Sequence, residues 1–70
     1  MRVVEDLADN LAKDAIELAN KLGDDEVIYE TAKVLVATSS TMEEAYMTSI
    51  RVRLAERRER RFLEEKAQTS

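Results

Sequence analysis

The side chains that could do chemistry in this sequence are arginines and carboxylates. Six arginines fall between residues 51 and 61, and three acids are adjacent at 24–26. The chain has no His and no Cys, which excludes imidazole or thiolate zinc sites, disulfides and His-based catalytic triads. Its single Gly cannot make a Gly-rich phosphate loop. Most catalytic chemistry is therefore ruled out by composition.

The acids at Asp24, Asp25 and Glu26 favour a structural interpretation. A calcium loop alternates oxygen ligands and carries a Gly in its middle, and this segment has neither feature. Acidic side chains are favoured in the first turn of a helix, so we interpret them as a helix N-terminus. Three aromatic residues among 70 offer little material to enclose a substrate. We therefore predict no catalytic residue, no metal site, no cofactor and no enzyme activity.

The arginines belong to an uneven charge distribution. Residues 51–70 hold seven basic and four acidic side chains, whereas residues 1–26 hold three basic and eight acidic ones. The net charge of −4 therefore combines an acidic N-terminal region with a basic C-terminal region. Surfaces of opposite charge associate quickly and specifically. We interpret the basic region as a solvated helix that pairs with acidic surface of its own or another chain, with nucleic acid as a less favoured partner.

The elements that must position these charges are predicted to be helices. Apolar residues recur at steps of three and four along the first helix, at Val4, Leu7, Leu11, Ala15, Leu18 and Leu22. This period predicts an amphipathic helix over about 3–22, ended by Gly23 in the left-handed conformation. A second, broadly apolar helix is predicted over about 25–38, capped by Asp24 or Asp25. A strand at 33–38 is the less favoured alternative, because no turn residues precede it.

A third helix is predicted over about 42–65. Ser40 with Glu43, or Thr41 with Glu44, matches the capping box that opens a helix. The apolar stripe of this helix comprises Met42, Tyr46, Met47, Ile50 and Leu54. Beyond it the helix is charged, with Phe62 and Leu63 as isolated apolar anchors, and residues 67–70 are predicted to be a frayed tail.

The predicted fold class is all-α. We expect a two- or three-helix antiparallel bundle with a long, charged C-terminal helix, in a single domain over 1–66. A chain of 70 residues builds only a small core, so the surplus apolar surface of the second helix predicts completion by dimerisation. The predicted core residues are Leu11, Ile16, Leu18, Leu22, Val27, Val34 and Leu35. No segment reads as a signal peptide or a bilayer span, which predicts a cytoplasmic protein.

The function predicted from these features is protein binding. We expect a non-catalytic helical regulator or inhibitor that binds another protein through a helical surface, as a homodimer. Methionine suits adaptable surfaces, and tyrosine and arginine are enriched at interfaces. The predicted protein-binding residues are Tyr46, Met47, Ile50, Leu54, Arg57, Arg58 and Arg61. A structural coiled coil is a weaker interpretation, because the stripe of the third helix ends after Leu54.

Residues 32–42 carry the alternative function. The segment Ala-Lys-Val-Leu-Val-Ala-Thr-Ser-Ser-Thr-Met resembles the helix–turn–helix of bacterial repressors, with small Ala32 early in the first helix and a Ser/Thr-rich entry to the second. Val36 stands where that pattern has Gly, and Glu43 and Glu44 would face the DNA phosphates. The resemblance implies a DNA-binding transcriptional regulator that uses residues of about 27–61.

Overall fold

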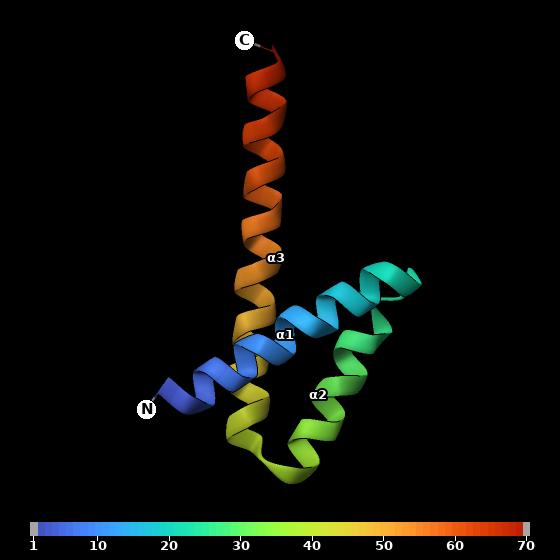
Figure 1. Ribbon diagram of the computed structural model, residues 1–70, viewed down its shortest axis with the longest axis vertical. Helices are drawn as coiled ribbons and strands as arrows, with labels where there is room; N and C mark the ends of the chain where they lie inside the picture. Colours follow the sequence, from blue (N-terminus) through green and yellow to red (C-terminus); the bar gives the residue numbers. More distant parts are fainter. Residues whose placement is uncertain (1, 70) are drawn as a thin grey trace.

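The computed structural model describes residues 2–69, which form three helices and no strand (Figure 1). Helix α1 spans Arg2–Leu22, α2 spans Glu26–Thr38 and α3 spans Ser40–Thr69. Helix α1 crosses α3, and α2 leads from the end of α1 to the start of α3 (Figure 1). The all-α fold class is thus confirmed, and the alternative of a strand at 33–38 is wrong because that segment lies within α2.

Gly23 ends α1 as its sequence position predicted. Its φ is +66°, a conformation that costs a residue with a Cβ about 1–2 kcal/mol. The backbone N–H of Gly23 donates to the carbonyl of Asn20 at 3.3 Å, and the N–H of Asp24 donates to the carbonyl of Ala19 at 3.0 Å. This pair of bonds is a Schellman motif. Oδ1 of Asp24 then accepts from the N–H of Glu26 at 3.0 Å and opens α2.

A single residue, Ser39, separates α2 from α3. Its extended backbone breaks the helix, and its Oγ accepts from the N–H of Met42 at 3.2 Å. The capping boxes predicted at Ser40 and Thr41 are therefore wrong, since the cap lies one residue earlier and its partner position is a methionine. Helix α3 begins at Ser40, two residues before the predicted start, because Ser39 satisfies its first turn.

The core is built on alanine. Five residues of α1 are buried, namely Ala8, Ala12, Ala15, Ile16 and Ala19, and they pack with Ile28 of α2 and with Tyr46 and Ile50 of α3. Small side chains allow helices to approach closely, so the alanine face of α1 accommodates the bulky tyrosine ring. Of the predicted core, Ile16 is confirmed, Leu35 packs partly against the cluster, and Val27 is half-buried.

The remaining core predictions are wrong. Leu11, Leu18, Leu22 and Val34 are exposed in the chain, with 37% to 68% of each accessible to solvent. On α1 the leucines form a stripe about 90° from the alanines, and the helix is turned so that the alanines meet α3. The apolar period therefore located the helix correctly but identified the wrong face as buried.

The C-terminal half of α3 projects beyond the other two helices (Figure 1). Residues 55–69, which we call the arm, are all exposed. Helix α3 continues to Thr69, so residues 67–69 of the predicted frayed tail are helical, and Ser70 lies outside the described residues. Ion pairing along the helix supports this length, as between Arg60 and Glu56.

Replacing Gly23 tests the turn. A Cβ at this position would meet nothing within 4 Å, so its cost is conformational rather than steric. We expect Gly23→Ala to lower the free energy of unfolding by about 1–2 kcal/mol, measured by urea denaturation. Gly23→Asn should lose less, because asparagine tolerates the left-handed region. Equal stability of the alanine variant and the natural chain would contradict this account.

Replacing Tyr46 tests the junction of α2 with α3. The Tyr46 hydroxyl is buried and donates to the carbonyl of Ile28 at 2.8 Å, and burial raises the pKa of this phenol. Tyr46→Phe keeps the ring but removes this bond, so we expect a loss of about 1 kcal/mol in urea denaturation. Tyr29→Phe, at an exposed tyrosine of α2, is the matched control and should leave stability unchanged.

Candidate functional site

The residues predicted to bind protein fall into three groups in the structure. Tyr46 and Ile50 are buried in the core, at 0% and 1% exposure. Met47 and Leu54 are partly buried against it. The three arginines of the set, Arg57, Arg58 and Arg61, are exposed on the arm. The surface therefore offers five of the seven residues, and their binding role stays a prediction.

Four of those residues, Leu54, Arg57, Arg58 and Arg61, line two adjoining hollows. The hollows lie where the arm extends from the part of the fold that contains α1 and α2. The first has a volume of about 260 Å³ and is lined by Leu54, Arg57, Arg58, Arg61 and Asp25. The second, of about 430 Å³, shares Arg57 and Arg61 and adds Asn20, Arg60 and Glu64.

We call these two hollows together the basic groove. Its arginines come from consecutive turns of α3, and its opposite wall comes from the end of α1 and the start of α2, at Asn20 and Asp25. Leu54 gives it an apolar element. The groove is open and shallow, so it suits the side of a helix or an extended segment better than an enclosed small molecule.

Two contacts fix α3 against α1, one just before the arm and one in the first turn of the arm. Arg53 donates from Nε and Nη2 to the two carboxylate oxygens of Asp9, at 2.9 and 2.8 Å. With its amide oxygen turned toward Arg57, Asn20 accepts from Nη2 and Nη1 at 2.7 and 3.1 Å. The bidentate pair defines the direction of the guanidinium as well as its distance. These contacts hold the arm at a set angle to α1 and so give the basic groove its shape.

The Asp9–Arg53 pair also makes the stability of this junction depend on pH. The hydrogen bond from Arg53 lowers the pKa of the Asp9 carboxyl below its ordinary value of 3.8, against a smaller opposing effect of burial. A carboxylate with a depressed pKa contributes stability above its unfolded pKa, and this contribution is lost as pH falls through the folded pKa. The pair is therefore intact at neutral pH and is lost in acid, below about pH 4.

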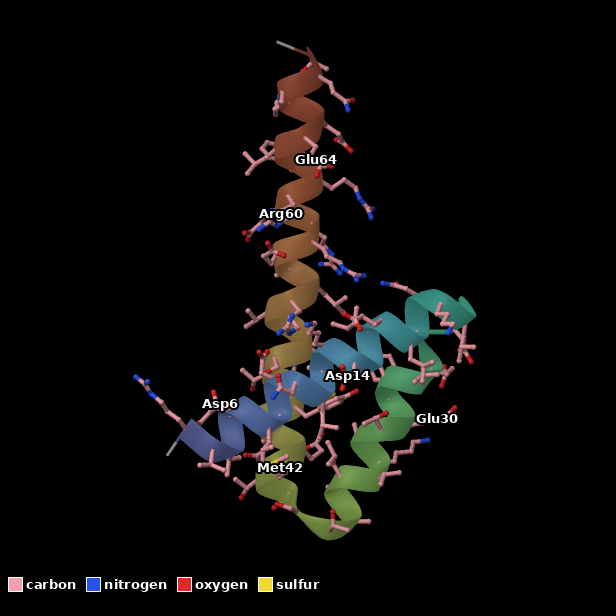
Figure 2. The ribbon with its side chains drawn as sticks, viewed as in Figure 1. Asp6, Asp14, Glu30, Met42, Arg60 and Glu64 are labelled. Atoms are coloured by element: carbon pink, nitrogen blue, oxygen red, sulfur yellow. The ribbon has the colours of Figure 1, made fainter. Side chains whose placement is uncertain are left out.

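Asp9→Asn should remove this pH-dependent contribution. Both side chains are more than a third exposed, so we expect a loss of about 0.5–1 kcal/mol at pH 7. The difference between variant and natural chain should shrink as pH falls from 5 toward 2, followed by urea denaturation at each pH. Asp6→Asn, at an exposed acid of the same helix (Figure 2), is the control. A pH-independent difference would contradict the assignment.

Sequence reasoning missed an exposed leucine face on α1. Five large apolar residues of this helix are 37% to 60% exposed, namely Val3, Leu7, Leu11, Leu18 and Leu22. The period of three and four revealed this stripe, but a stripe of leucines is ordinarily taken as core. Only the orientation of α1 in the fold shows that it faces outward.

A second missed surface lies on α3, on the side away from the core. Val52, Phe62 and Leu63 are 63%, 57% and 64% exposed, and Ala55 lies on the same side of the helix. At 100° per residue these four fall within an arc of about 100°, opposite the arc that holds Tyr46 and Ile50. In the sequence these four residues form a second, weaker apolar stripe, and the charged residues between them obscure its period.

In comparisons with known proteins, no family model, no curated protein and no solved structure matches this chain. Among residues 2–69, no helix combines the length and apolarity needed to cross a membrane. Within the same residues, no three acidic side chains gather as metal ligands would. The case for function therefore depends on the exposed apolar faces and the basic groove.

Proposed function

We propose that the protein is a non-catalytic helical module that binds another protein and acts as a homodimer, in the manner of a small regulator or inhibitor. The observation that carries this proposal is that small apolar residues are buried in the core while large apolar residues lie exposed on the surface. Alanine makes up half of the buried set, whereas eleven large apolar residues are exposed. Burial of such side chains stabilises an association by about 25 cal/mol for each Å² removed from water.

The basic groove supports an acidic partner. Arg58 and Arg61 are exposed and line it, and Leu54 adds apolar surface to the same lining. A helix that carries glutamates beside a leucine would meet both features at once. Arginine forks bind carboxylates bidentately, so the groove favours an acidic segment over a neutral one.

The helix–turn–helix alternative finds less support in the geometry. In that motif a turn of three or four residues joins the two helices, whereas one residue joins α2 to α3. Glu43 and Glu44 lie in the first turns of α3, where a recognition helix would approach the phosphates. Duplex DNA therefore serves as a competing ligand in the test and is not the ligand we propose.

An amphipathic peptide of glutamate and leucine, labelled with a fluorophore, tests the groove. We expect it to bind in fluorescence anisotropy, and we expect a charge-inverted twin with lysine in place of glutamate not to bind. Arg58→Glu combined with Arg61→Glu should weaken binding at least about tenfold, which is about 1.4 kcal/mol.

Two controls make this test decisive. Arg2→Glu changes an exposed arginine of α1 that lies outside both hollows, and it should leave binding unchanged. Equal binding of the lysine twin, or no effect of the double variant, would refute an acidic partner. Tighter binding of a DNA duplex than of the acidic peptide at about 150 mM salt would favour the repressor-like alternative instead.

A further inference from the structure

The arm is the least supported part of the fold. All fifteen of its residues, 55–69, are exposed, and the C-terminal end of the arm projects far beyond α1 and α2 (Figure 1). A helix of about this length is only marginally stable alone in water. Ion pairs between its own turns, each worth about 0.2–0.5 kcal/mol, help it only slightly. A second surface against the arm would supply the missing stability.

The outward side of the arm has the pattern that such a surface needs. Val52, Ala55, Phe62 and Leu63 share one arc of α3, which faces away from α1 and α2 and is open to an incoming helix. Lys66 lies over the Phe62 ring, 5.8 Å from its centroid, so its apolar stem extends the same arc while its charge stays in water. Glu59 is the one acid in the middle of the arc.

We propose that two copies of the chain associate by packing these arcs together, arm against arm and antiparallel, with the two-fold axis beside Glu59. This inference rests on the homodimer proposed above and names its interface. In this register Ala55 of one copy lies opposite Leu63 of the second copy, so a small residue meets a large one at both ends. The same patch of both copies forms the interface, so each contact between them occurs twice, as a two-fold interface requires.

The charges at the edges of the arc favour the antiparallel arrangement. On one edge, Arg51 of one copy comes within a turn of Glu65 of the second copy. On the other edge, Glu56 comes equally close to Arg60 of the second copy. A parallel arrangement would instead face each edge with the opposite edge of the second copy, where Arg51 would meet Glu56 but Arg58 would meet Arg60, so fewer opposite charges would pair. At the axis itself the two Glu59 residues approach one another unfavourably, and so do the two Arg58 residues on one edge.

The apolar arc is short, so we expect a reversible dimer with a dissociation constant in the micromolar range rather than an obligate one. Because the arm is marginal alone, its helicity should rise with association. The circular dichroism signal at 222 nm per residue should therefore increase with protein concentration over the same range as the mass.

Disulfide mapping tests the register, since the natural chain has no Cys to interfere. A mixture of full-length Ala55→Cys and Leu63→Cys chains should form a crosslinked heterodimer under mild oxidation, because the two Cβ atoms would lie within the roughly 4 Å that a disulfide needs. Ala55→Cys alone should not crosslink, because its two copies would lie about 12 Å apart along the helix axis. Efficient crosslinking of Ala55→Cys alone would refute the antiparallel register.

Light scattering over a range of concentrations separates this inference from the homodimer proposal. Phe62→Glu combined with Leu63→Glu should raise the dissociation constant at least tenfold, whereas Val36→Glu, at an exposed valine of α2, should leave it unchanged. Glu59→Gln should tighten the dimer by relieving repulsion at the axis. A dimer that survives the double variant would refute the arm interface and leave the homodimer standing, and a natural chain that stays monomeric at every concentration would refute both.

Discussion

The close packing of the alanine face of α1 against Tyr46 of α3 is the constraint on which the rest of the structure depends. A tyrosine ring can be fully buried in so small a core only where the opposing helix carries short side chains and a buried oxygen accepts its hydroxyl. The alanines provide the space, and the carbonyl of Ile28 accepts the hydrogen bond. One side chain thereby joins all three helices, since α2 supplies the acceptor and α1 the surrounding surface.

That packing determines which surfaces face water. Turning the alanines inward places the leucines of α1 outward, because the two stripes lie on adjacent faces of one helix. The Asp9–Arg53 pair then sets how far α3 is rotated against α1, which directs Arg57 and Arg61 toward Asn20 and Asp25 and forms the basic groove. The opposite side of α3 is left free for a second copy. The two proposed contacts therefore use different sides of one helix, and Arg60 lies at the border between them.

Several features could be predicted from the sequence because local chemistry alone determines them. The limits of α1 and α2 follow from apolar period, capping residues and one glycine whose positive φ few other residues tolerate. The start of α3 was predicted less well, because three neighbouring hydroxyl residues could each cap it and only Ser39 has the extended backbone that a cap needs. The arginines of the groove were identified by type and spacing, but Tyr46 and Ile50 were assigned to the same surface although they are buried.

The sequence by itself determined the helices and the separation of acidic and basic regions, since both depend on residues near one another in the chain. Only the tertiary structure decided which apolar face of α1 is buried. Leucine is the more hydrophobic residue, so composition favoured the leucine stripe, whereas the space required by a tyrosine eighteen positions from its acceptor selected the alanines. The same non-local choice brought Asp9 to Arg53 and left the C-terminal part of α3 projecting beyond the other two helices (Figure 1).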